Sequence, residues 1–449
     1  MSGDAPELVG RVHQNLHLRP GADEVQALLT VDATGSARPA PEAAEVIAVD
    51  VSRSMGEPAE KLRRAIEATG AAIDALRDGV HFAVVAGSHE ARVVYPARAG
   101  TERAGARTRA EAKEAVAHLV AGGGTAIGTW LRLIRALLAG HPGAIRHAIL
   151  LTDGRDEHES ADDLAAAVAA CEGVFRCDAR GVGDDWSAAE LRDITRALLG
   201  SADLVPHPAA MAADFRALMA ASMRKQVADV ALRVWTPVGA RVLLVKQTSP
   251  DVIDLTAGRV DADEQVGTYP TGAWGTEERD FHVSLSVPAA AVGQERLACR
   301  LSFVRALPGG GGVRPLEQAF VRTRPNGTRE THAEALVSAI WTDDPGRDTA
   351  PHPLVLASLD QDAVEAAVDR VAAAFRSGDH VTAGQWLDDI RPRAEQAGMS
   401  DLVARIDGLR DAETGTYEID PAGLLGIEIE SSRLPPSPRT GERRRGRRR

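Results

Sequence analysis

The feature that most restricts the fold of this chain is an alternation of short apolar runs with amphipathic segments between Glu45 and about Lys225. Val46–Val49 reads as a buried strand, and Pro58–Arg77 repeats its apolar residues at helical spacing. The run RHAILLTDG, ending at Gly154, reads as another buried strand. Strands that alternate with helices form a parallel sheet with helices on both faces. We therefore expect a doubly wound, Rossmann-like, mainly parallel α/β domain over residues 43–225.

The pattern changes on both sides of this domain. After Lys225, runs such as VADVALRVWTP alternate apolar and polar residues, and Gly- and Pro-rich turns such as LPGGGGVRP separate them. This pattern is typical of an antiparallel β-sandwich. The first forty residues have the same character and cannot bury an apolar face alone. We expect residues 6–40 and 226–342 to form one β-sandwich, with the α/β domain inserted within it.

The C-terminal part changes character again. Three segments over residues 355–412 carry apolar stripes at helical spacing, among them Val364, Val368, Val371 and Phe375, which predicts a small helical bundle. Residues 430–449 end in the basic block GERRRGRRR and have no apolar side chain after Leu434. Such a segment cannot bury a core, so we expect a disordered Arg-rich tail.

Composition restricts the class of protein. A chain of 449 residues is long enough for several domains, and 44% hydrophobic with 26% charged residues is typical of soluble globular proteins. The formal charge of −12 argues against nucleic-acid binding by the folded body. Three cysteines are too few for a disulfide scaffold, and no run has the length of a secretory signal or of a membrane span. We expect a cytoplasmic, multidomain α/β plus β protein.

Oxygen-bearing side chains follow two of the predicted strands. Asp50, Ser52 and Ser54 stand on alternate residues in DVSRSM, which places them on one side of an extended segment. Asp153 leaves a second strand at the same sheet edge, where open α/β sheets bind their ligands. Between them, the glycines of GGGTAIG permit a tight turn in front of Thr125. These five side chains can converge on one point.

Two carboxylates and three hydroxyls without His or Cys suit a hard cation with oxygen ligands, which indicates Mg²⁺ with Mn²⁺ as a substitute. Neutral hydroxyls leave the metal much of its charge, so an external carboxylate can bind at an open position. The alternative is that these residues only cap helices and shape turns. Any one of the three motifs alone favours capping, and the three together favour a metal site.

DVSRSM, GGGTAIG and LLTDG together resemble the three parts of the metal-ion-dependent adhesion site of von Willebrand factor A (VWA) domains. By this resemblance, the metal site consists of Asp50, Ser52, Ser54, Thr125 and Asp153. Arg53 departs from the small residue usual between the two serines. The flanking organisation is similar to intracellular bacterial VWA proteins related to the calcium-activated-chloride-channel-like group. The resemblance implies partners such as AAA ATPases or Ser/Thr kinases and phosphatases.

These observations leave several functions open. The first is a non-enzymatic interaction module in which Mg²⁺ captures an Asp or Glu of a partner protein. The second is an accessory subunit of an ATP-driven machine, since the chain has no nucleotide-binding loop of its own. The third is a scaffold whose Arg-rich tail contacts nucleic acid, anionic lipid or an acidic surface. A hydrolase is disfavoured, because no base stands beside the metal ligands; we expect no enzyme activity.

Two further polar features each have a structural and a functional interpretation. The acidic stretch Asp156-Glu157-His158-Glu159 is either a solvated loop or a second metal or partner site. His147 precedes the strand that carries Asp153, and we interpret it as a packing residue rather than a catalytic base.

Overall fold

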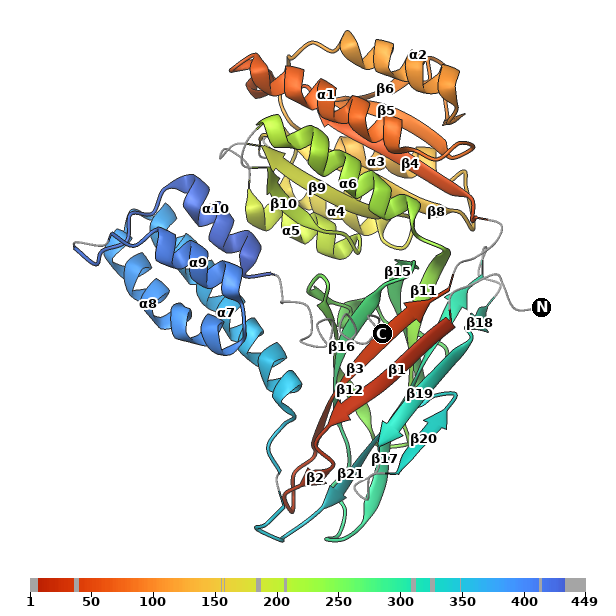
Figure 1. The fold of residues 1–449 in the computed structure, drawn as a ribbon, viewed down its shortest axis with the longest axis vertical. Coiled ribbons are helices and arrows are strands. Elements are labelled where there is room, and N and C mark those ends of the chain that lie inside the picture. Colours follow the sequence, from red (N-terminus) through yellow and green to blue (C-terminus); the bar gives the residue numbers. More distant parts are fainter. Residues whose placement is uncertain are drawn as a thin grey trace, which may run out of the picture.

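The structure is a computed structural model of the whole chain. It describes residues 7–35, 40–154, 156, 158–182, 187–205, 208–307, 312–323, 328–347, 349–411 and 414–432. Figure 1 shows three regions: an α/β unit at the top, a β region below it, and a group of helices at the left. The Arg-rich tail from residue 433 onward lies outside the described residues.

The α/β unit is built on one mainly parallel sheet. Its strands are β4 (Ala43–Asp50), β5 (His81–Gly87), β6 (Ala91–Tyr95), β7 (Glu102–Arg103), β8 (Ile145–Thr152), β9 (Arg176–Val182) and β10 (Ala202–Val205). Their order is β10-β9-β8-β4-β5-β6, with β7 also paired to β5. Only β6 and β7 run antiparallel to their neighbour. The predicted α/β fold is confirmed, and its central strand is longer than the predicted Val46–Val49.

Helices cover both faces of this sheet. They are α1 (Glu60–Ala75), α2 (Ala106–Ala117), α3 (Ile127–Leu138), α4 (Ala161–Cys171), α5 (Ala188–Ala197) and α6 (Met211–Met223). Alternate residues of β4 serve the two faces, because successive strand side chains point in opposite directions. Ile47 and Val49 share a core with α1, α2 and α6, whereas Val46 and Ala48 share a core with α3, α4 and α5. This double burial explains why the strand is apolar at every position up to Asp50.

The β region consists of two further sheets. Its strands are β1 (Glu7–Gln14), β2 (His17–Leu18), β3 (Glu24–Thr34), β11 (Val227–Trp235), β12 (Arg241–Ser249), β13 (Ile253–Asp254), β14 (Val260–Asp261), β15 (Val266–Trp274), β16 (Glu278–Ser286), β17 (Glu295–Ala306), β18 (Val313–Pro315), β19 (Gln318–Thr323), β20 (Arg329–His332) and β21 (Ala335–Trp341). One sheet has the order β13-β12-β16-β3-β1-β19-β20, and the other β14-β15-β11-β17-β21-β2. Buried residues of both sheets, such as Phe281 and Phe303, form one hydrophobic core.

The N-terminal strands belong to this region and not to the α/β unit. β3 pairs antiparallel with β16, and β1 pairs parallel with β19. The chain therefore leaves these sheets after β3, forms the α/β unit, and returns at β11. The buried face of β3 is completed by strands about 250 residues later in the sequence, for example in the pair Leu29 and Phe281.

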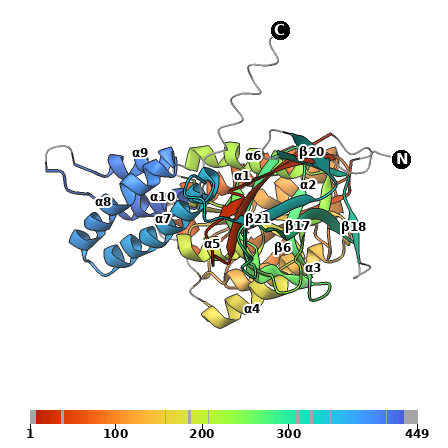
Figure 2. The same ribbon diagram turned by 90° about the horizontal axis from the view of Figure 1, so that it is seen from below.

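The C-terminal helices are α7 (Pro353–Arg376), α8 (His380–Gln396), α9 (Ser400–Gly408) and α10 (Pro421–Glu430). The sequence predicted three helices ending near residue 412; α10 lies beyond that boundary. Its residues Leu424 and Ile427 pack in the core of α7, α8 and α9, whereas Leu425 and Ile429 pack against the α/β unit. α10 thus joins the helical group to the α/β unit, and both ribbon views place this group at one side of the molecule (Figures 1 and 2).

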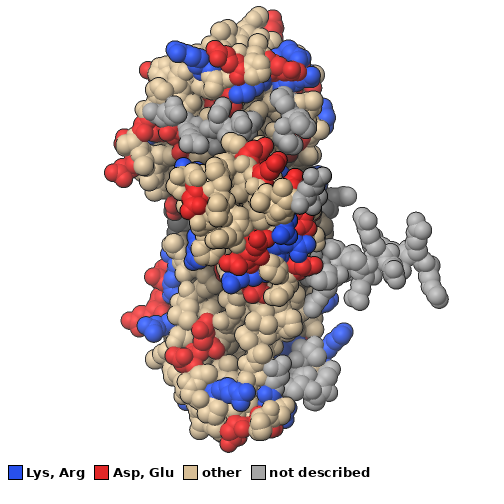
Figure 3. All heavy atoms as spheres, turned by 90° about the vertical axis from the view of Figure 1, so that its left-hand side faces the viewer, with Lys and Arg blue, Asp and Glu red and all other residues tan. Residues whose placement is uncertain are grey.

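Charge and cysteine usage agree with a well-packed chain. Acidic and basic side chains are interspersed over the face shown in Figure 3, without a large surface of one sign. All three cysteines, Cys171, Cys177 and Cys299, are free and buried. Among the described residues, no helix is both long and apolar enough to cross a membrane.

Candidate metal centre

The two predicted carboxylates meet at one edge of the α/β sheet. Asp50 is the last residue of β4, and Asp153 follows directly on β8. The two strands pair in parallel, with Val49 opposite Leu151, so their carboxyl ends coincide. Both aspartates have no exposed surface, and both stand at the ends of their strands. The register of two adjacent strands therefore brings together residues about a hundred positions apart.

The serines reach the same place by a different route from the predicted one. The extended segment ends at Ser52, and the chain turns into the short 3₁₀ helix η1 (Arg53–Gly56). Ser54 is therefore positioned by a helical turn and not by strand alternation. The turn is closed by the Met55 N–H donating to the Ser52 carbonyl at 3.2 Å. The expectation of an extended DVSRSM was wrong, but the turn still directs both serine hydroxyls to one side.

A chain of short hydrogen bonds links these side chains. The Ser52 and Ser54 hydroxyl oxygens lie 3.0 Å apart, and the Ser54 hydroxyl donates to Asp153 Oδ1 at 2.7 Å. The Ser52 N–H donates to Asp50 Oδ1 at 2.7 Å, and the Thr152 hydroxyl donates to Asp50 Oδ2 at 2.6 Å. These hydrogen bonds hold oxygen atoms from the ends of β4 and β8 and from the η1 turn in contact with one another.

Thr125 reaches the cluster through the glycine loop. The Gly122 N–H donates to the Val51 carbonyl at 2.7 Å, and the Arg53 N–H donates to the Gly123 carbonyl at 3.1 Å. Gly123 has a φ of +82°, a conformation that favours glycine. A Cβ added at Gly154 would lie 3.4 Å from the Thr125 Oγ1 and 3.8 Å from the Ser54 Oγ. The Thr125 hydroxyl therefore faces the same small space as the Ser54 hydroxyl.

Helix capping does not account for these oxygens. The N-cap residues of α1 and α3 are Ala59 and Ala126, and neither side chain accepts a hydrogen bond from a backbone N–H of its helix. The first turn of α3 is capped from another loop: the Ile127 N–H donates to Asp156 Oδ2 at 2.8 Å, and the Gly128 N–H donates to Glu159. The serine and threonine hydroxyls at the sheet edge are left for another role.

The electrostatics of the site favour a cation. Burial raises the pKa of Asp50 to about 6; hydrogen bonds from Ser52 and Thr152 act in the opposite direction, and the negative charge of Asp153 raises it further. The nearby cation is Lys61 of α1, whose Nζ lies 2.9 Å from Asp153 Oδ2. Two buried carboxylates facing one another are stabilised when additional positive charge lies between or beside them.

The donor set fits a hard divalent cation. Asp50, Ser52, Ser54, Thr125 and Asp153 would hold it, because all supply oxygen ligands and none is a thiol or imidazole. The space bounded by the Thr125 and Ser54 hydroxyls, which a side chain at residue 154 would fill, provides room beside them. The described residues contain no group of three or more His, Cys, Asp or Glu side chains that could hold a metal. The candidate site is not a group of this kind, because it has only two carboxylates and its other three donors are hydroxyls.

Two residues around the site were not singled out from the sequence: Lys61 binds Asp153, and Thr152 binds Asp50. Glu159, from the acidic stretch noted in the sequence, holds the first turn of α3 through the Gly128 N–H. Thr152 carries a weak sequence signal, since it directly precedes Asp153. Lys61 carries none, because its reach depends on how α1 packs over the sheet edge. Arg53 is exposed and makes no side-chain contact within the described part of the chain.

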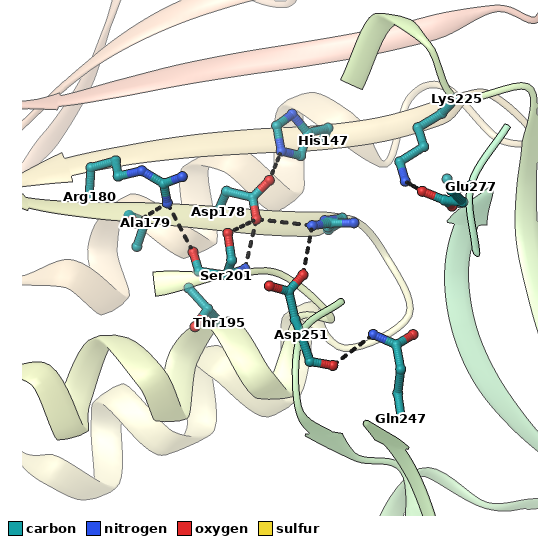
Figure 4. Close-up of polar contacts among 12 residues, drawn as sticks. His147, Asp178, Ala179, Arg180, Thr195, Ser201, Lys225, Gln247, Asp251 and Glu277 are labelled. Carbon is teal, nitrogen blue, oxygen red and sulfur yellow. Dashed lines mark hydrogen bonds and ion pairs between the residues drawn. The ribbon is translucent and has the colours of Figure 1, made fainter. Parts of the chain in front are cut away.

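The opposite end of the sheet holds a second, different polar cluster (Figure 4). His147 is buried between Glu45 and Asp178, with its ring nitrogens 2.7 and 2.9 Å from the two carboxylates. The two carboxylates raise the pKa of His147 to about 9 against the opposing effect of burial. Nearby, Lys225 pairs with Glu277 at 2.6 Å across the junction with the β region. Because both ring nitrogens of His147 are engaged, the cluster joins strands and domains and offers no free base.

Comparisons with known proteins agree with this architecture. A family model described as the von Willebrand factor type A domain matches residues 44–204. The solved structure of a von Willebrand factor type A protein from Catenulispora acidiphila is 39% identical, has a TM-score of 0.87, and aligns over 97% of this chain and 99% of its own. The chain belongs to the von Willebrand factor type A family. The matched residues 44–204 lie within the α/β unit, which we therefore call the von Willebrand factor type A domain.

A more distant structure has the same overall fold. The ArnB paralog VWA2 from Sulfolobus acidocaldarius is 12% identical, with a TM-score of 0.56 over 95% of this chain and 98% of its own. This likeness extends over the β region and the C-terminal helices as well as the von Willebrand factor type A domain. No protein with curated annotation matches the chain.

Proposed function

We propose that this protein is a metal-dependent protein-interaction module without catalytic activity. Mg²⁺, held by Asp50, Ser52, Ser54, Thr125 and Asp153, captures an Asp or Glu side chain of a partner protein. The observation that supports this most strongly is the convergence of the Ser52, Ser54 and Asp153 oxygens, which contact one another at 3.0 and 2.7 Å. Membership in the von Willebrand factor type A family supports the general role in protein interaction.

The balance of ligand charges supports capture of a carboxylate. Three of the five proposed ligands are neutral hydroxyls, so they do not reduce the charge of a bound cation. Mg²⁺ also retains several water molecules in protein sites, and a carboxylate can replace one of them. When bound, the metal supplies a positively charged Lewis-acid position that binds an acidic side chain; the protein supplies its orientation through the β4 and β8 strand ends.

The side chains around the cluster are already engaged, and this supports a binding role over hydrolysis. In the described residues, Thr152 and Lys61 bind the two aspartates, and His158 Nδ1 accepts the Thr125 N–H at 3.3 Å. A metal-dependent hydrolase needs a group that accepts a proton from the attacking water. His147, the buried histidine of the domain, lies at the other end of β8 and pairs with two carboxylates.

Affinity purification from the native host tests this proposal. The full chain is used as bait in Mg²⁺, in EDTA, and as the Thr125→Val variant, which removes one ligand oxygen with little change of side-chain volume. We expect a partner that binds in Mg²⁺, is released by EDTA, returns when Mg²⁺ is restored, and is lost with Thr125→Val. A matched Glu114→Gln variant on the exposed face of α2 should retain the partner. Partners that bind equally in EDTA would contradict the proposal.

A further inference from the structure

A groove between α4 and α5 lies beside the candidate metal centre and is not explained by it. The groove has a volume of about 490 Å³. Its apolar floor is formed by Leu164 and Val168 of α4 and Ile194 of α5. Its rim carries five carboxylates: Asp156, Glu159, Glu172, Glu190 and Asp193. An apolar floor with an acidic rim suits a segment whose side chains have apolar stems and cationic ends.

The same chain contains a segment of that chemistry. Residues 433–449, which lie outside the described residues, contain eight arginines and one glutamate. Arginine can lay its methylene stem along apolar surface while its guanidinium pairs with carboxylates at the rim. We propose that the groove between α4 and α5 is the docking site for the Arg-rich C-terminal segment of this same chain, residues 433–449.

α10 packs on α5, the helix that forms one wall of the groove. Arg192 of α5 donates to the carbonyl of Glu428 at 2.9 Å, and the next residue of α5, Asp193, lines the groove. The described chain continues only four residues further, to Ser432. Three prolines follow at 435, 436 and 438. Ten residues, 433–442, separate Ser432 from the arginine run that begins at Arg443.

Two of the rim carboxylates have raised pKa values. Glu159 has only 8% of its side chain exposed, and the cation paired with it, Arg132, is 3.4 Å away. Burial and the neighbouring Asp156 raise the pKa of Glu159 to about 7. Burial also raises the pKa of Asp193. A guanidinium placed between these groups would relieve the repulsion among the carboxylates, and this favours occupation by arginine.

The groove shares one border with the candidate metal centre. Asp156 and Glu159 hold the first turn of α3, which begins two residues after Thr125. An intramolecular segment has an effective concentration in the millimolar range, so even a weak contact would be occupied most of the time. The groove and its occupant do not require metal, and their test does not depend on the proposed function.

The experiment measures the binding of a fluorescent peptide, with the sequence of residues 433–449, to the full chain. Binding is followed by fluorescence anisotropy in EDTA. In a neutral-tail variant, Arg443, Arg444, Arg445, Arg447, Arg448 and Arg449 are all replaced by Ser. We expect the peptide to bind this variant at least tenfold more tightly than it binds the wild-type chain, whose own tail competes. Raising NaCl from 50 to 200 mM should weaken the binding at least tenfold, since the contact is made by several ion pairs.

Variants in the neutral-tail background locate the site. Glu172→Gln with Asp193→Asn should weaken peptide binding at least tenfold, whereas the matched pair Glu114→Gln with Glu264→Gln, on exposed surfaces elsewhere, should leave it unchanged. Equal binding to the wild-type and neutral-tail chains, or equal binding to the two double variants, would overturn the proposal. Concentration-dependent dimerisation of the wild-type chain in sedimentation velocity, lost in the neutral-tail variant, would show that the tail binds a second copy and would also overturn it.

Discussion

Lys61 and Asp153 form the ion pair that borders the candidate metal centre, with Nζ 2.9 Å from Oδ2. The other oxygen of the same carboxylate, Oδ1, accepts the hydroxyl of Ser54. Asp153 thus faces a built-in ammonium on one side and the cluster of proposed ligands on the other. The structure therefore predicts that the lysine charge opposes the binding of a divalent cation while it neutralises part of the buried aspartate pair.

Replacing Lys61 with Met should strengthen Mg²⁺ binding at least tenfold, because a like charge a few ångströms from a cation is repelled by about 1 kcal/mol per unit charge even at the dielectric of water. Calorimetric titration of Mg²⁺ into the metal-stripped chain measures this change. Lys61→Arg keeps the charge and should leave the affinity within about twofold of wild type. Weaker binding by Lys61→Met would instead mean that Lys61 mainly orients Asp153.

Thr125→Val should weaken Mn²⁺ binding at least tenfold, because it removes one proposed ligand oxygen. It should change the free energy of unfolding by less than about 1 kcal/mol, since no protein hydrogen bond to the Thr125 hydroxyl is seen in the described residues. Electron paramagnetic resonance of free Mn²⁺ gives the affinity, and urea unfolding gives the stability. Thr125→Ser keeps the oxygen and should bind nearly as the wild type does. If Thr125→Val binds Mn²⁺ normally, Thr125 is not a ligand.

His147 should make stability depend on pH. Its pKa is raised from 6.5 to about 9 in the folded chain, so its stabilising effect is complete below pH 6.5 and is lost as the pH rises through 9. The total effect is on the order of 3 kcal/mol. Lys225 has the opposite effect on stability. Burial lowers its pKa to about 8, so its contribution to the free energy of unfolding increases as the pH rises above 8.

Comparison of the wild type with His147→Gln isolates the histidine. Urea unfolding at pH 6, 7.5 and 9.5 should show a difference in stability that is largest at pH 6 and smallest at pH 9.5, while the Lys225 contribution cancels between the two proteins. A difference that does not change with pH would show that His147 is neutral between Glu45 and Asp178.

Ile429→Ala should loosen the C-terminal helices from the von Willebrand factor type A domain. Ile429 is 2% exposed and packs in the core shared with α5, so its truncation should cost about 2–4 kcal/mol at that contact. Hydrogen exchange should increase in α10 and in the facing part of α5. The exposed Leu356 of α7 gives a matched control, and Leu356→Ala should leave exchange in α10 unchanged.

Much of the fold follows from local pattern. Val46–Val49 is apolar at every position because both faces of β4 are covered, and this distinguishes it from the alternating strands such as β11. α10 could not be recognised in the same way. Its sequence PAGLLGIEIE is apolar on two sides, since it packs against the helical group and the α/β domain together, so no amphipathic stripe marks it as a helix.

The meeting of the candidate ligands at one sheet edge was predictable where sequence order alone fixes their position. Asp50 and Asp153 end neighbouring parallel strands, and strand order brings such ends together. Ser54 was predicted at the right place for the wrong reason, because a 3₁₀ turn and not an extended segment orients it. Lys61, Asp156 and Glu159 depend on tertiary packing: each contacts a residue at least 29 positions away in the chain. Local sequence carries no signal for such contacts.

Isothermal titration of Mg²⁺ into the metal-stripped full chain shows whether the edge of the α/β sheet binds a cation. We expect one Mg²⁺ per chain, no detectable binding by an Asp50→Asn chain that remains folded by circular dichroism, and unchanged binding by the control Glu114→Gln. An Asp50→Asn chain that binds Mg²⁺ as tightly as the wild type, or a wild-type chain that binds none, would contradict this expectation.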